Sequence, residues 1–383
     1  MTAEFGHVEW LVGELATGRV TTVIPLDQGI WTLTLDDAGT LNGQLPLNDA
    51  DVAALNLAST AEPGRCFLAA AWINPDGEET ILEAGPIWTH DLDADTQILR
   101  VGAAGLWSYY DHRKVLPVLS GGQTAATAGF AATGVSLGTI AKQLVELAHT
   151  HTGGALPVNL PADEAGVWEK TYPGYELGDV GPRIKEITEL EGGPEVAFVP
   201  RRSTTDGRYL EWDMQVGTTA APLLEQGGPD WVWDAAVPQS TVSGIGVNVD
   251  GTRLGSRAWV PGAGQGEARL IAEAEDSTLT AGGWPLLEVT GDARDSVEDP
   301  ALLAAYATQL AARSRRPWQT WTLKVNPGSY PPVGGYRPGH WARVIVGAHN
   351  YLTSGDYRGR IVQLVGDSAG GVRVQFQPSQ GEG

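Results

Sequence analysis

The chain has 383 residues, which is too long for one ordinary domain and fits two to four. Hydrophobic residues make up 42% and charged residues 19%, so packed cores are expected and wholesale disorder is excluded. The formal net charge of -21 disfavours nucleic-acid binding over most of the surface, because such binding needs Lys and Arg at the phosphates. The plainest explanation of the acidity is solubility.

The single cysteine gives no sign of an oxidising compartment, and the apolar runs are too short to indicate a membrane segment. Cys66 is the single cysteine and has apolar neighbours, so we expect a buried, unpaired thiol. The N-terminus MTAEFGHVEW lacks the pattern of a signal peptide, and no run reaches the roughly 18 apolar residues of a membrane helix. The 50 glycines, 24 prolines and 14 tryptophans favour short strands joined by turns over a helical bundle.

Residues 1–120 are predicted to form a first β domain. The alternation of apolar and polar residues in IWTLTL places Trp31, Leu33 and Leu35 on one face of a strand. Turn-forming sequences follow at 36–39, 74–77 and 93–96. Short strands at such even spacing are typical of a small barrel or sandwich.

Residues 121–235 are predicted to form an α+β middle domain. The small, uncharged stretch 121–134 indicates a loop or linker. Ser136 is a candidate cap for a helix that ends at Gly153 and Gly154, and a second helix begins near Asp179. The next two strands form a hairpin whose tip lies at 206–207. The apolar residues of the first helix recur at helical spacing: Leu137, Ile140, Ala141, Leu144, Val145 and Ala148.

Residues 236–378 are predicted to form a second β domain with one helix. Asp250 and Gly251 indicate another hairpin, and Asp299 with Pro300 indicates a helix start. Four late strands follow, and 379–383 is expected to be a disordered tail. The predicted fold class is therefore mainly β, with two barrel-like β domains on either side of a mixed segment.

Patterns that would carry catalysis or metal binding have simpler explanations. His149 and His151 are two residues apart, do not share a helix face, and fit a solvated helix end better than a metal site. The acids at 91, 93 and 95 lack the later residues of a calcium loop and fit a turn. Ser136 in GVSLG fits a helix cap better than a nucleophile. We expect no catalytic residue, no metal and no cofactor.

Several phrases, spread along nearly the whole chain, resemble one family: the minor tail proteins of actinobacterial siphoviruses, which are baseplate hub (tail-tip) proteins. The first phrases are TGRVTTVIPLDQGIWTLTLDDAGTLNGQLPL and AGLWSYYDHRKV, which ends near Arg113. The most distinctive is KTYPGYELGDVGPRIKEITELEGGPEVAF, and GHWARVIV and YRGRIVQLVGD close the series. The third phrase contains Tyr172, Tyr175, Gly181 and the run Gly192, Gly193 and Pro194.

The resemblance implies a structural protein of the virion tail tip, assembled in the host cytoplasm. It implies a homotrimeric ring that continues the tail tube and docks a distal tail protein, a tape-measure protein and other tip or fibre proteins. Genome DNA would pass through the lumen without specific binding. Since larger relatives append a C-terminal domain and this chain ends after its last strand, a hub without that domain is expected.

The stretch GLWSYYDHRKVL is the strongest candidate for an interface. We expect Trp107, Tyr109 and Tyr110 to anchor the edge of the first β domain against the middle segment or a neighbouring subunit, with Arg113 paired to an acid. Two other functions remain open. Pairs such as Trp231 with Trp233, and Trp318 with Trp321, would suit a carbohydrate-binding receptor protein, although packing is favoured. A cell-wall-degrading enzyme would need a defined acid or Ser/His site.

Overall fold

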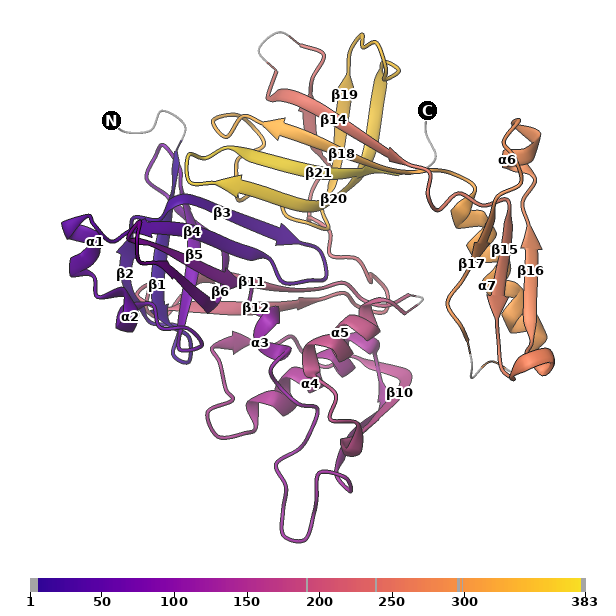
Figure 1. The fold of residues 1–383 in the computed structure, drawn as a ribbon, viewed down its shortest axis with the longest axis horizontal. Helices are drawn as coiled ribbons and strands as arrows, with labels where there is room; N and C mark the ends of the chain where they lie inside the picture. Colours follow the sequence, from indigo (N-terminus) through magenta and orange to yellow (C-terminus); the bar gives the residue numbers. More distant parts are fainter. Residues whose placement is uncertain (1–5, 191, 238–239, 295–296, 298, 380–383) are drawn as a thin grey trace. The chain divides into compact units, whose positions relative to one another are not determined.

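The computed structural model describes residues 6–190, 192–237, 240–294, 297 and 299–379. The chain divides into two compact units: unit 1 is Met1–Ile245 with Thr322–Gly383, and unit 2 is Gly246–Trp321. Strands take up more of the described chain than helices do, so the prediction of a mainly β fold is confirmed (Figure 1). The boundaries between these units lie at 245/246 and 321/322, not at the predicted domain boundaries near 120 and 235. The division into three domains remains a prediction.

The first hundred residues form antiparallel strands of one sheet. The turns predicted at 36–39, 74–77 and 93–96 each join neighbouring antiparallel strands. Asp93 closes its turn by accepting hydrogen bonds from the backbone N–H groups of Asp95 and Thr96, both at 3.1 Å. The elements are β1 (His7–Glu14), β2 (Val20–Ile24), β3 (Asp27–Thr34), β4 (Thr40–Pro46), α1 (Ala50–Ala54), α2 (Leu57–Thr60), β5 (Cys66–Ile73), β6 (Glu79–Asp93) and β7 (Ile98–Ala104).

The following segment mixes helices with short sheets. As predicted, Ser136 caps a helix: its Oγ accepts from the backbone N–H of Thr139 at 3.1 Å. The predicted hairpin with its tip at 206–207 is also present. The elements are α3 (Trp107–Tyr110), β8 (Gly129–Val135), α4 (Leu137–His149), β9 (Val158–Asn159), β10 (Ala165–Pro173), η1 (Gly174–Glu176), α5 (Val180–Thr188), β11 (Val196–Arg202) and β12 (Leu210–Val216).

The last part of the chain returns to strands and joins the first part in one sheet. Strand β20 pairs antiparallel with β3, with Leu364 opposite Leu33. The described residues thus form a thirteen-stranded sheet that combines early and late strands. Strands of the two predicted β domains therefore belong to one hydrogen-bonded sheet. The late elements of this sheet are β13 (Trp231–Asp234), β14 (Val242–Asp250), β18 (Trp318–Val325), β19 (Trp341–Val346), β20 (Gly355–Asp367) and β21 (Val372–Pro378).

Unit 2 has a small core of its own. Helix α7 packs on a three-stranded sheet through Leu303 and Ala307, which meet Val260 and Ala272. Asp299 caps α7 and Pro300 is its first residue, as predicted. The elements are β15 (Arg257–Pro261), η2 (Gly266–Ala268), β16 (Ile271–Glu275), α6 (Thr278–Ala281), β17 (Glu288–Thr290) and α7 (Pro300–Ser314).

Two local predictions are wrong. The stretch 121–134 is not all loop, because β8 begins at Gly129 and pairs with β10. The pair Asp250 and Gly251 does not form a hairpin tip, because β14 and β15 belong to different sheets. In both places the choice of strand partner is made by distant residues rather than by the local turn or loop signal. Except for Ser379, the predicted tail 379–383 lies outside the described residues.

Candidate functional site: an aromatic cluster and a junction pocket

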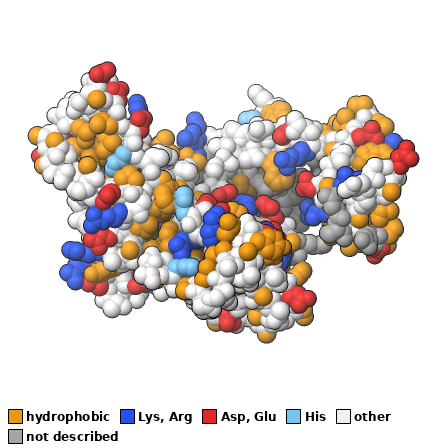
Figure 2. Space-filling model, turned by 60° about the horizontal axis from the view of Figure 1, so that its bottom comes forward, with side chains coloured by type: hydrophobic (Ala, Val, Ile, Leu, Met, Phe, Trp, Pro, Cys, Tyr) orange, Lys and Arg blue, Asp and Glu red, His pale blue; other side chains and the backbone are white. Residues whose placement is uncertain are grey.

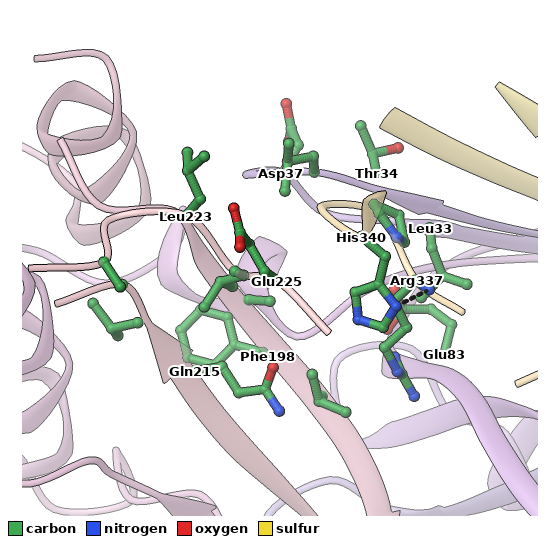
Figure 3. A pocket seen from close by; sticks show the side chains of 18 of the residues that line it. Leu33, Thr34, Asp37, Glu83, Phe198, Gln215, Leu223, Glu225, Arg337 and His340 are labelled. Carbon is green, nitrogen blue, oxygen red and sulfur yellow. Dashed lines mark hydrogen bonds between the residues drawn. The ribbon is translucent and has the colours of Figure 1, made fainter. Parts of the chain in front are cut away.

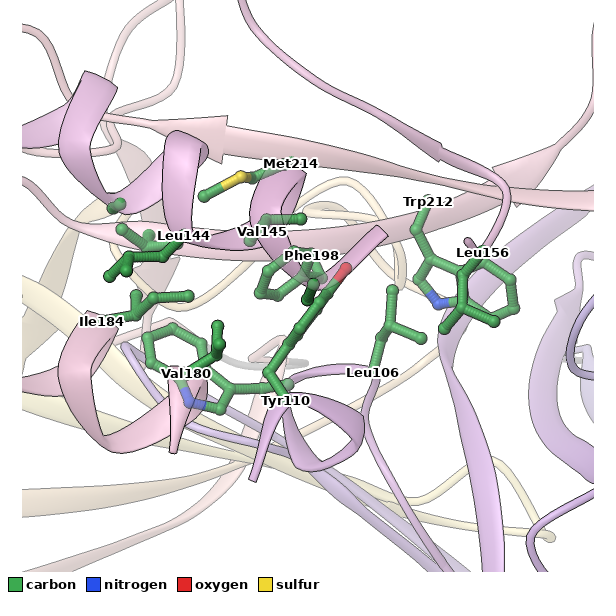
Figure 4. Close-up of a cluster of buried hydrophobic side chains, with 14 of the residues drawn as sticks. Leu106, Tyr110, Leu144, Val145, Leu156, Val180, Ile184, Phe198, Trp212 and Met214 are labelled. Atoms are coloured by element: carbon green, nitrogen blue, oxygen red, sulfur yellow. The ribbon is translucent and has the colours of Figure 1, made fainter. Parts of the chain in front are cut away.

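The aromatic cluster is built around α3 and consists of Trp107, Tyr110, Phe198 and His149. The rings of Trp107 and Phe198 meet edge to face with centroids 6.0 Å apart, and Tyr110 stacks on Phe198 at 5.0 Å. Tyr110 is fully buried, and its hydroxyl lies 3.0 Å from Nε2 of His149. The cluster therefore joins α3 and α4 to the β11–β12 hairpin within one core (Figure 4).

The side chains of Tyr109 and Arg113 bind backbone carbonyl groups at the end of α4 and just after it, and not an acidic side chain. The Tyr109 hydroxyl donates to the carbonyl of Gly154 at 3.0 Å, and Arg113 Nη2 donates to the carbonyl of Ala148 at 2.9 Å. The last carbonyls of a helix have no partner within the helix, so a cation there is stabilising. The expected pairing of Arg113 with an acid is thus replaced by a bond to backbone. His149 is half-buried, which lowers its pKa and corrects the expectation of a solvated helix end.

The residues of the distinctive phrase 170–198 do not converge on one point. Tyr172 is buried on β10, with the Arg183 guanidinium 4.7 Å from its ring centroid, and burial raises its pKa to about 12. Tyr175 is 68% exposed. Gly192 has a φ of +69°, a left-handed conformation that favours glycine just beyond a helix end. Gly193 follows it, and Pro194 is buried at the start of the hairpin.

The aromatic pairs considered for sugar binding do not form open platforms. In each pair one ring is buried: Trp233 and Trp321 are both 1% exposed, and Trp107 is 5% exposed. Trp231 donates its indole N–H to Nδ1 of His340 at 3.1 Å. The buried ring of each pair therefore serves packing, as favoured from the sequence.

A cavity of about 230 Å³, here called the junction pocket, lies where four parts of unit 1 meet (Figure 3). The end of β3 and the turn after it contribute Leu33 and Asp37, and β6 contributes Glu83. The hairpin contributes Phe198, and the segment before β19 contributes Arg337. The pocket thus lies between early strands, the hairpin and a late segment of the chain.

Burial sets the electrostatics of the pocket. Glu83 is 6% exposed, and burial raises its pKa to about 8, against the opposing effects of a backbone hydrogen bond and of Arg337. Arg337 donates to the carbonyl of Ile81 at 3.2 Å. Burial lowers the pKa of His340 to about 4, so this imidazole is neutral at pH 7. The pocket therefore holds a protonated carboxyl group and a neutral histidine at neutral pH.

A second set of buried charges ties the hairpin to strands on either side. Arg360 on β20 contacts Glu195 at 2.7 Å, and both side chains are mostly buried, at 14% and 11% exposed. The carboxylate of Asp36 accepts a hydrogen bond from the backbone N–H of Val196 at 2.8 Å, and burial raises its pKa to about 6. These contacts fix the turn after β3 and strand β20 to the same end of the hairpin.

The sequence analysis did not identify Glu83, Arg337, Glu195 or Arg360. One signal was available for Glu83, which is the only acid in the otherwise apolar run ILEAGPIW and so was bound to be buried if that run is a core strand. Nothing local distinguishes the other three from surface charges.

In the described part of the chain, no three His, Cys, Asp or Glu side chains gather in a way that would hold a metal ion. Within the same residues, none of the helices has the length and apolar character needed to cross a bilayer. Cys66 is buried and unpaired, as expected, and its burial raises the pKa of the thiol.

The fold is similar to that of solved phage tail proteins. No family model and no curated protein matches the chain. Solved structures do match along nearly its whole length, at identities low enough that only the fold is shared.

Three of these structures can be named. The 43 kDa tail protein of prophage MuSo2 from Shewanella oneidensis aligns with a TM-score of 0.56 and 11% identity, over 96% of this chain and 97% of that one. A tail protein from Neisseria meningitidis MC58 aligns with a TM-score of 0.54 and 14% identity, over 97% of each chain. A chain of the Francisella PdpA-VgrG complex, in its lidded form, reaches 0.50 at 9% identity, over 98% of this chain and 53% of that one.

Proposed function

We propose that this chain is a structural component of a phage tail tip, a baseplate hub that assembles as a homotrimeric ring continuing the tail tube. The observation that carries the proposal is the shared fold, which extends over 96% of this chain and 97% of the MuSo2 tail protein. Local resemblance of the phrases around Arg113, Tyr172 and Gly192 points to the hub type. In such a ring, docking surfaces rather than a reaction centre are the functional parts.

Exposed apolar side chains offer a surface for contact between subunits or with neighbouring tail proteins. Figure 2 turns the bottom of Figure 1 forward and shows hydrophobic side chains gathered on that face. On β10 and just after it, Val167 is 92% exposed, Tyr175 68% and Leu177 50%. Large apolar side chains exposed at the surface are typical of interfaces.

The net charge of -21 fits a channel through which DNA slides without sticking, if acids face the lumen. In this account the partners are the distal tail protein above the ring, tip or fibre proteins below it, and the tape-measure protein at the centre. A map of an assembled tail would test the lumen. Acidic lumen walls are expected, and basic walls would contradict this part of the proposal.

A charge placed in the exposed apolar surface tests the assembly. Val167→Asp should lower the mass of the purified trimer, because burying an unpaired carboxylate in an interface is costly. Ser59→Asp puts the same charge on the exposed face of α2 and should leave the mass unchanged. If Val167→Asp leaves the trimer intact, this surface is not part of the subunit contact.

A further inference from the structure

The junction pocket is lined by a largely buried carboxyl group, and one oxygen of this group accepts no hydrogen bond from the described residues. Glu83 is 6% exposed, and its Oε1 accepts from the backbone N–H of Ala84 at 2.9 Å. Its Oε2 receives no hydrogen bond from the described part of the chain, where no ion pair joins Glu83 to Arg337 either. Glu83 also lines a smaller cavity beside Trp107. A carboxyl oxygen that opens onto a cavity and is not used by the protein is available to a ligand.

The charges around the pocket favour a cationic ligand. Asp37, Glu83 and Glu225 line it. The facing cations are the Arg337 guanidinium and the Lys185 ammonium, which lies 3.2 Å from Asp37. Arg337 is directed to the backbone carbonyl groups of Ile81 and Leu82, and His340 is neutral at pH 7. A cation beside Glu83 would therefore meet carboxyl groups in excess.

The walls of the pocket are suited to an apolar stem. Leu33 lies on one side, Phe198 and Leu223 on the other, and all three line the same cavity as Glu83 (Figure 3). Leu223 is 39% exposed, which places it at the mouth. A chain of methylene groups can thus lie against hydrocarbon while its charged end reaches inward.

We propose that the junction pocket binds an alkylguanidinium or alkylammonium group, with the cation at the carboxylate of Glu83 and the stem against Leu33, Phe198 and Leu223. An arginine or lysine side chain of another protein carries this chemistry, and so does a free alkylamine. The proposal concerns a binding site in unit 1 and does not depend on the trimer.

Binding of such a cation requires Glu83 to lose its proton. Because burial raises the pKa of Glu83 to about 8, the affinity should rise about tenfold per pH unit below that value and level off above it. The other ionisable groups that line the pocket are Arg337, Asp37, Glu225 and His340. His340 stays neutral across this range because its pKa is about 4.

Calorimetric titration of the full chain with n-butylguanidinium tests the site. The intact protein should bind it with the stated pH dependence, and n-butanesulfonate should not bind. Glu83→Gln should weaken binding about tenfold or more and abolish the pH dependence, since the hydrogen bond to a charged group is lost. Asp95→Asn removes the same charge from an exposed turn and should change neither property.

Leu223→Trp provides a second variant, which blocks the mouth without changing any charge and should also abolish binding. The source of the cation follows from two further ligands. Tighter binding of N-acetylarginine N-methylamide than of agmatine supports a protein side chain, and the reverse order supports a free amine. The proposal is overturned if the intact protein binds no n-butylguanidinium near pH 8, or if Glu83→Gln binds it as tightly with the same pH profile.

Discussion

Replacing Trp107 with alanine tests whether the aromatic cluster holds the middle segment to the first strands. The ring is 5% exposed and meets Phe198 edge to face. A buried aromatic side chain hides about 150–250 Å², which corresponds to about 4–6 kcal/mol at 25 cal/mol per Å². The unfolded chain already hides part of this area, so we expect a loss of about 3–5 kcal/mol in the free energy of unfolding.

Urea unfolding followed by circular dichroism measures this loss. Since the two units need not unfold together, amide exchange should be followed separately in α4 of unit 1 and α7 of unit 2. Trp107→Ala should speed exchange in α4 and leave α7 unchanged. Tyr175→Ala, at a position 68% exposed, is the aromatic control and should cost less than about 1 kcal/mol.

An unchanged midpoint and unchanged exchange in α4 would refute the reasoning. Such a result would mean that Trp107 contributes no net packing energy inside the chain. Its role would then have to be sought in contact with another protein.

Two further predictions concern the buried charges of unit 1. Arg360→Met should destabilise the protein by about 3–5 kcal/mol in urea unfolding, because it leaves Glu195 buried without its partner, and Glu195→Gln added to it should restore part of the loss. The pKa of Glu83 is about 8 in the folded protein and about 4.5 in the unfolded chain. The stabilisation that comes from this difference is full below about pH 4.5. It is lost across the window from about pH 4.5 to about pH 8. The free energy of unfolding should therefore fall by about 1.4 kcal/mol per pH unit in that window, and Glu83→Gln should remove this slope; equal slopes in both proteins would contradict the assignment.

Local chemistry was enough to predict many of the turns and helix ends. The turn closed by Asp93, the caps Ser136 and Asp299, and the hairpin tip at 206–207 each depend on residues within a few positions of one another. Such signals survive folding because the backbone groups they satisfy are adjacent in sequence.

Strand partners and buried charges could not be predicted in the same way. Strand β8 is made of small residues, and it is a strand because β10 pairs with it. The pairing of β20 with β3 joins residues more than three hundred positions apart. Likewise, Arg337 becomes part of a pocket only because β6 and the segment before β19 meet in the fold. These features follow from tertiary contacts, which no local pattern encodes.

The mass of the purified chain in solution, measured by light scattering and checked by negative-stain imaging, tests the proposed role most directly. A hub that closes a ring with copies of itself should show three times the 40.5 kDa of one chain, together with three-fold rings in the images. A mass of 40.5 kDa at every concentration, with no rings, would contradict the homotrimer.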